Sequence, residues 1–175
     1  GVFIEWHNNV GLYTKSKYEG EVPRLDRFYR FLLKEKIPGK ARRWCEKTPR
    51  NVRYFGKILD FFAGEVKLIH IIRDGRDVML SEHPTAPGEY WVEPERWLND
   101  VRKGLEYKDH PQVLTIKYEN LISSYEETMK KICDFLGEEW VEEISSWIDH
   151  TNVQKNLAWD GTVKELHTDS IGKWK

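Results

Sequence analysis

Residues 67–81 read KLIHIIRDGRDVMLS, and this stretch decides the fold class. The apolar run from Val66 to Ile72 is short and β-branched, as in a strand that is buried on both faces of a sheet. An Arg-Asp-Gly-Arg-Asp cluster ends the run, and a short helix is predicted from about Gly75 to Glu82. The cluster is open to two interpretations: a solvated turn with local ion pairs, or an anion-binding site.

Strands and helices alternate along the rest of the chain. Thr48 and Pro49 have the residue types of an N-cap and a first helical residue, and a helix is predicted from there to Gly64. The other predicted elements are a second strand at 112–118, a proline-rich loop at 83–94, and helices at 22–36, 94–107, 124–136 and about 138–149. This alternation predicts a layered α/β fold with a mainly parallel sheet. Two strands are too few for such a sheet, so a third is expected, with VFIEW at residues 2–6 as the local candidate.

Length, charge and cysteine content limit the class of protein. At 175 residues the chain is long enough for one domain with its own core, so a single domain over residues 1–175 is predicted. The net charge of −1 argues against a general nucleic-acid binder, so any cationic function must be a local pocket. Cys45 and Cys133 lack metal-ligand spacing, which argues against a disulfide framework and a cysteine-ligated zinc site. No apolar run spans a bilayer and no signal-peptide pattern opens the chain, so a reducing cytoplasm is the expected compartment.

The end of the first predicted strand carries the residue types of an anion site. In open α/β sheets, ligands bind beyond the carboxyl ends of the strands, where Arg73 is expected. Its guanidinium, the amide groups at the start of the next helix and the hydroxyl of Ser81 would together hold a phosphate monoester. Asp74 and Asp77 would then be helix-start residues, satisfied by the helix dipole and by Arg76.

A second candidate anion site is the segment WCEKTPRN, at residues 44–51. Lys47 directly precedes a predicted helix N-terminus, so a cation and free amide donors lie together. The alternative is an ordinary capped helix with a surface lysine. Two anion sites in one small α/β domain would favour a nucleotide ligand.

Four segments in this order resemble the PAPS-dependent sulfotransferases, where PAPS is 3′-phosphoadenosine 5′-phosphosulfate. They are EKTPRN, KLIHIIRDGRDVMLS, IKYENLISSYEETMKKICDFLG and IGKWK, and together they extend over residues 44–175. The strongest is the strand followed by Arg-x-x-Arg-Asp and, after three residues, Ser. The resemblance implies a three-layer α/β/α domain with a P-loop NTPase-like fold.

The resemblance also implies roles for individual residues. Arg73 and Ser81 would hold the 3′-phosphate of PAPS, and Lys47 would contact the sulfonate side and stabilise charge on the leaving group. The remaining residues implied to bind the nucleotide are Tyr118, Thr151 and Val153 near adenine, and Ile171, Gly172, Lys173 and Trp174 in a loop over the 3′-phosphate.

The sequence departs from the family pattern at two places. No Gly-rich basic loop of the kind that binds the 5′-phosphosulfate occurs between residues 1 and 40, so the chain is expected to be N-terminally incomplete, without its first strand and that loop. The small-molecule enzymes carry a catalytic His where this chain has Pro49, and the glycosaminoglycan and bacterial branches resemble EKTP better. FIEWHNN therefore supplies the candidate bases, Glu5 or His7, unless both are edge-strand residues without a catalytic role.

The implied reaction moves a sulfonate group from PAPS to a hydroxyl or amine of a small-molecule or glycan acceptor and gives PAP. It needs positioning and cationic stabilisation more than covalent catalysis, and no metal is expected. Neither nucleic acid nor membrane insertion is expected, and the oligomeric state stays open. Two alternatives remain: a P-loop kinase, against which the chain has no Walker-type Gly-Lys-Ser/Thr, and a non-catalytic domain that kept the fold.

Overall fold

The structure is a computed structural model that describes residues 45, 47, 49–62, 64–83, 86–90, 92–151, 155–156, 161–163 and 165–175. The chain divides into two compact units, Gly1–Lys47 and Thr48–Lys175, and the fold given below is that of the second. The helix predicted at 22–36 and the strand predicted at 2–6 lie outside the described residues. No helix in the described ranges has the length and apolar character needed to cross a membrane.

The two predicted strands pair in parallel. Strand β1, Leu68–Ile72, lies beside β4, Val113–Lys117, with Leu68 opposite Val113 and Ile72 opposite Lys117. Parallel pairing brings the carboxyl ends of both strands to the same edge of the sheet. The residues that follow them, Arg73 and Tyr118, therefore emerge next to each other.

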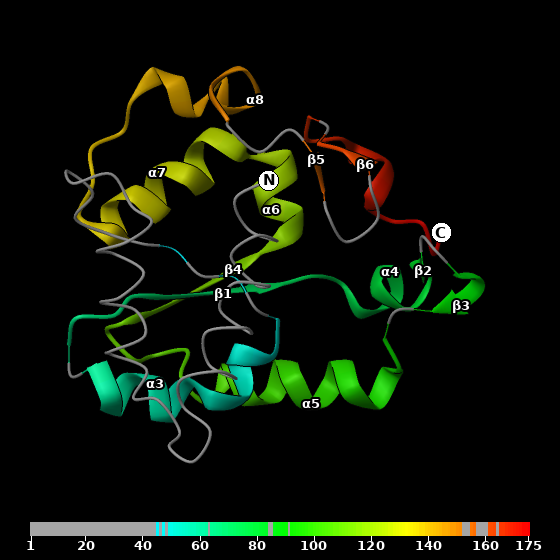
Figure 1. Cartoon of the computed structure of the whole chain (residues 1–175), viewed down its shortest axis with the longest axis horizontal. Helices are drawn as coiled ribbons and strands as arrows, with labels where there is room; N and C mark the ends of the chain where they lie inside the picture. Colours follow the sequence, from blue (N-terminus) through cyan, green and yellow to red (C-terminus); the bar gives the residue numbers. More distant parts are fainter. Residues whose placement is uncertain are drawn as a thin grey trace, which may run out of the picture. The chain divides into compact units, whose positions relative to one another are not determined.

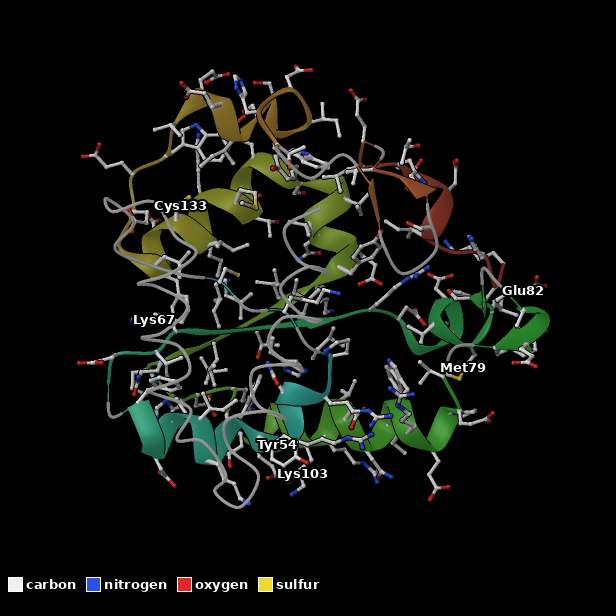
Figure 2. All side chains as sticks on the ribbon, viewed as in Figure 1. Tyr54, Lys67, Met79, Glu82, Lys103 and Cys133 are labelled. Carbon is white, nitrogen blue, oxygen red and sulfur yellow. The ribbon has the colours of Figure 1, made fainter. Side chains whose placement is uncertain are left out.

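Helices cover both faces of this sheet, which confirms the predicted α/β fold (Figure 1). One layer holds the 3₁₀ helix η1, Pro49–Tyr54, with α3, Phe55–Phe62, and α5, Pro94–Leu105; the other holds α6, Tyr118–Ser123, and α7, Tyr125–Leu136. Tyr54 and Lys103 lie on the first side and Cys133 on the second (Figure 2).

The first layer packs against the sheet through an apolar core. Its buried members come from η1, α3 and β4: Val52, Phe55, Leu59 and Val113. Helix α5 approaches β1 so closely at Gly104 that a Cβ atom there would lie 2.0 Å from Cε1 of His70. The His70 ring is itself buried and meets Phe55 edge-on, with 5.8 Å between ring centres. This contact fixes α5 against the strand that ends at the candidate site.

The segment after β1 differs from the prediction in two ways. Helix α4, Gly75–Met79, ends three residues early. The loop predicted at 83–94 contains an antiparallel pair, β2 (Glu82–His83) and β3 (Ala86–Tyr90), with Gly88 at φ 84°. Proline is tolerated in the edge strands of a two-stranded ribbon, and for that reason the prolines did not exclude strand structure here.

The later elements are shorter than predicted. Gly137, at φ 72°, ends α7 as expected, whereas the side chain of Ser124 makes no capping hydrogen bond at its start. The helix predicted at 138–149 is two pieces, η2 (Glu142–Ile144) and α8 (Trp147–His150), separated by Ser145 and Ser146. The short pair β5 (Lys155–Asn156) and β6 (Gly161–Thr162) and the 3₁₀ helix η3 (Thr168–Ser170) follow.

Candidate functional site

The candidate site lies at the carboxyl edge of the parallel sheet. Arg73 follows β1 and Tyr118 follows β4, and both side chains are half-buried. The guanidinium carbon of Arg73 lies 5.2 Å from the centre of the Tyr118 ring, a cation–π distance. The paired strand ends thus place a cation and an aromatic ring together at the edge where α/β sheets bind ligands.

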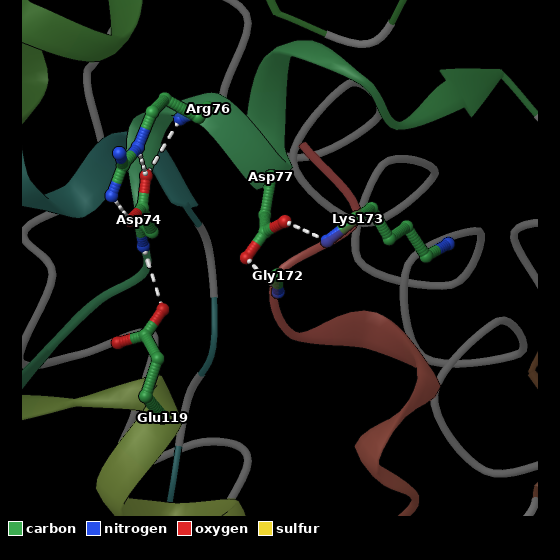
Figure 3. Close-up of polar contacts among 6 residues, drawn as sticks. All are labelled: Asp74, Arg76, Asp77, Glu119, Gly172 and Lys173. Carbon is green, nitrogen blue, oxygen red and sulfur yellow. Dashed lines mark hydrogen bonds and ion pairs between the residues drawn. The ribbon is translucent and has the colours of Figure 1, made fainter. Parts of the chain in front are cut away.

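Two carboxylates accept hydrogen bonds from backbone N–H groups at the start of α4 (Figure 3). Asp74 is the N-cap: its Oδ1 accepts the backbone N–H of Arg76 at 2.9 Å, and the Arg76 guanidinium binds both of its oxygens, at 3.0 and 2.6 Å. Glu119 accepts the backbone N–H of Asp74 at 2.7 Å. The hydrogen bonds from Arg76 lower the pKa of Asp74 to about 2. Asp74 is thus a helix-start residue satisfied by Arg76, as predicted, but two amides expected to be free for an anion are taken.

Asp77 has a different role from the one predicted. It lies in the first turn of α4 as predicted, but it is only 1% exposed and its carboxylate accepts two backbone N–H groups from distant residues. Gly172 donates to its Oδ2 at 2.8 Å and Lys173 to its Oδ1 at 2.7 Å (Figure 3). Gly172 adopts φ 73°, a left-handed conformation in which consecutive N–H groups can converge on one anion.

Residues 170–174, here called the C-terminal segment, also contact the strand edge. Nη2 of Arg73 donates to the carbonyl oxygen of Ser170, and the Tyr118 hydroxyl lies 3.0 Å from Oγ of Ser170. The guanidinium carbon of Arg76 lies 3.3 Å from the centre of the Trp174 ring. Predicted site residues from three distant parts of the sequence are therefore brought together.

One buried nitrogen of the Arg73 side chain, Nε, has no hydrogen-bond partner in the described part of the chain. Buried donors without a partner are rare in proteins, so this atom fits an acceptor supplied by a ligand. Ser81 is half-buried after α4, and its hydroxyl donates to the carbonyl oxygen of Asp77 at 2.9 Å.

The other predicted site residues are placed as follows. Thr151 is half-buried at the end of α8, and Ile171 is half-buried and donates its N–H to Thr168. Lys47 is exposed and belongs to the first unit of the chain. The remaining three, Glu5, His7 and Val153, lie outside the described residues.

Two carboxylate contacts and one residue of this site were not predicted from the sequence. The missed features are the bonds of Asp77 to the C-terminal segment, the cap that Glu119 places on Asp74, and Ser170 as the partner of Arg73.

Comparison with known proteins decides the family. A family model described as "Sulfotransferase family" matches residues 19–142. The chain belongs to the sulfotransferase family. The resemblance drawn from the four sequence segments is thereby confirmed, and the parallel sheet with helices on both faces agrees with that family's fold. No solved structure matches the chain.

The curated relatives in this family are longer than the chain. Sulfotransferase 2A6 of Rattus norvegicus is 28% identical over 151 residues, covering 76% of this chain and 49% of the relative. Sulfotransferase 2A1 of Mus musculus is 25% identical over 147 residues, covering 66% and 52%. A 3-alpha-hydroxysteroid sulfotransferase of Cavia porcellus is 33% identical over 95 residues, covering 44% and 33%. The chain thus spans about half the length of the first two relatives.

Proposed function

We propose that this chain binds PAPS and takes part in the transfer of its sulfonate group to a hydroxyl or amine acceptor, giving PAP. The observation that carries the proposal is the buried Nε of Arg73, which has no partner in the described part of the chain, at the carboxyl edge of the parallel strands. A guanidinium with a free buried N–H is well suited to bind a phosphate oxygen.

Arg73 would anchor the 3′-phosphate and so select PAPS over nucleotides that lack this group. The Tyr118 ring, 5.2 Å from the Arg73 guanidinium, is suited to contact adenine. Ser81 would reach the same phosphate after releasing its bond to the Asp77 carbonyl. PAPS itself supplies the activated sulfonate. Thr151, Val153, Ile171 and Trp174 stay proposed nucleotide contacts on the strength of the family resemblance.

The catalytic roles that the family resemblance implies also stay proposals. Lys47 is proposed to stabilise charge on the leaving group, because a cation lowers the free energy of a transition state that develops negative charge. Glu5 or His7 is proposed to accept the acceptor's proton. A single sulfotransferase-like domain over residues 1–175 also stays a proposal.

The acceptor class is proposed from the relatives. Two Cavia porcellus relatives are named for 3-alpha- and 3-beta-hydroxysteroids, and both names describe a small molecule with a hydroxyl group. We therefore favour a small-molecule alcohol over a glycan, although Pro49 departs from the small-molecule pattern. Cys45 and Cys133 are both free thiols, which fits the proposed reducing cytoplasm.

Calorimetric titration with PAP tests this function. Arg73→Ala should weaken PAP binding by more than about 1.5 kcal/mol, roughly tenfold, because a charge-assisted bond is lost. The PAP affinity of Arg73→Lys should lie between those of Arg73→Ala and the wild type, since lysine keeps the positive charge but lacks the planar guanidinium. The matched control is Arg102→Ala, which removes an exposed arginine of α5. Unchanged PAP affinity in folded Arg73→Ala would refute the proposed site, and displacement of PAP by equimolar ATP would favour the kinase alternative.

A further inference from the structure

Asp77 is the most deeply buried charged side chain of the described residues, at 1% exposure. A buried carboxylate is costly unless hydrogen bonds compensate for the lost hydration. Here both oxygens accept a backbone N–H, from Gly172 and Lys173, at 2.8 and 2.7 Å. Bonds to an ionised acceptor are about twice as strong as neutral ones, so Asp77 binds the C-terminal segment firmly.

These two N–H groups cannot serve Asp77 and a bound phosphate at the same time. Each amide has one hydrogen, and both hydrogens are aimed at the carboxylate. Two consecutive amides after a left-handed glycine form the kind of concave site that proteins use for anions. In this chain the anion is a side chain of α4 (Figure 3).

The segment that Asp77 holds is the one that orients Arg73. Ser170, two residues before Gly172, accepts a hydrogen bond from Nη2 of Arg73 and lies 3.0 Å from the Tyr118 hydroxyl. One end of the guanidinium is thereby fixed, and Nε remains without a partner in the described ranges. Without the bonds to Asp77, the segment would lose its two strongest links to α4, and the contacts of Ser170 with Arg73 and Tyr118 would loosen.

We propose that Asp77 is a positioning residue for the phosphate anchor. It holds the C-terminal segment so that Ser170 orients the Arg73 guanidinium with Nε toward the ligand. The backbone amides of Gly172 and Lys173 serve this structural bond, and Arg73 is the anion contact. This inference rests on the proposed function, because it assumes that Arg73 binds the phosphate of PAPS.

Asp77→Asn tests the proposal with little change in shape. One carboxylate oxygen becomes an NH₂ group that faces an N–H donor, so at least one of the two bonds is lost. We expect faster hydrogen exchange at the Gly172 and Lys173 amides, and a PAP dissociation constant raised about tenfold, which equals about 1.4 kcal/mol. Asp109→Asn, which makes the same chemical change at a side chain that is 89% exposed, should leave both measurements unchanged.

A double-mutant cycle separates positioning from mere stabilisation. If Asp77 acts through Arg73, Asp77→Asn should weaken PAP binding far less in the Arg73→Ala background than in the wild type. Equal effects in both backgrounds, or normal PAP affinity in folded Asp77→Asn, would overturn the proposal.

A measurement on the wild-type chain covers the case in which Asp77→Asn does not fold. Through-hydrogen-bond NMR couplings between the Gly172 and Lys173 amide nitrogens and the Asp77 carboxyl carbon should persist when PAP is added. Their loss on PAP addition would show that the amides turn to the phosphate, and would refute the inference. Failure of the wild type to bind PAP would refute the proposed function, whereas absence of the couplings in the ligand-free chain would refute the bond of Asp77 itself.

Discussion

Replacing Gly104 by alanine should destabilise the fold through one contact. Gly104 is buried in α5 where this helix meets β1, and a Cβ atom there would lie 2.0, 2.4 and 2.5 Å from three atoms of the His70 ring. An ordinary contact begins at 3.4 Å, so the nearest atom is too close by roughly 1.4 Å. The ring has little room to move, because His70 is buried and Phe55 packs against it edge-on. Helix α5 must therefore move away from β1.

The net cost is the overpacking penalty less the gain in helix propensity. Overpacking in a core costs about 1–3 kcal/mol, and a clash with a confined ring belongs near the upper end. Glycine to alanine inside a helix gains about 1 kcal/mol. We expect the free energy of unfolding to fall by about 2 kcal/mol, and Tm by about 4–8 °C for a chain of this length.

Urea unfolding of four proteins measures this effect: the wild type, Gly104→Ala, His70→Ala and the double variant. Removing the ring should remove the clash, so Gly104→Ala in the His70→Ala background should be neutral or stabilising. A Gly104→Ala variant as stable as the wild type, or an equal loss of stability in both backgrounds, would refute the predicted clash with the His70 ring.

Three further outcomes are expected. Burial lowers the pKa of His70, so the folded state favours the neutral ring. The stabilisation should be complete above the unfolded pKa of about 6.5 and should decrease as the pH falls below it. The urea midpoints at pH 7.5 and 5.5 should therefore differ less in His70→Leu than in the wild type. Gly137→Ala should lower the free energy of unfolding by about 1 kcal/mol, because the residue has φ 72°; an unchanged midpoint in urea would contradict this. Ser81→Ala should raise the PAP dissociation constant about fivefold by calorimetry, as for the loss of a neutral hydrogen bond, and equal affinity would remove Ser81 from the phosphate site.

The fold class was predictable because its signals are local. Residues 68–72 and 113–117 are short β-branched runs, and the amphipathic helices between and after them leave parallel pairing as the expected arrangement. The ribbon at 82–90 was not predictable in this way, because its prolines and Gly88 are also typical of an irregular loop. The break at Ser145 and Ser146 was likewise not predictable, because apolar residues at helical spacing lie on both sides of it.

The candidate site was predictable in part for the same reason. Arg73 and Tyr118 were placed at strand ends from the sequence, and parallel pairing brings them together. The partner of Asp77 was not predictable. Gly172 lies 95 residues away, and because every residue except proline has a backbone N–H group, the sequence does not show which one binds. Two of the amides expected to be free at the start of α4 are taken, and the contact with Glu119 was not predictable because this residue belongs to the distant helix α6.

The wide sequence separation within the site sets the order in which it can form. Arg73 and Ser170 are 97 residues apart, and Asp77 and Gly172 are 95 apart, whereas the turn around Asp74 uses partners two residues away. Closing such long loops carries an entropic cost that must be met before the contacts form, so these bonds belong to a late step of folding. During synthesis, α4 emerges long before residues 170–173, and Asp77 must remain hydrated until they arrive. The contact that orients the Arg73 guanidinium is therefore completed only after residue 170 has been made.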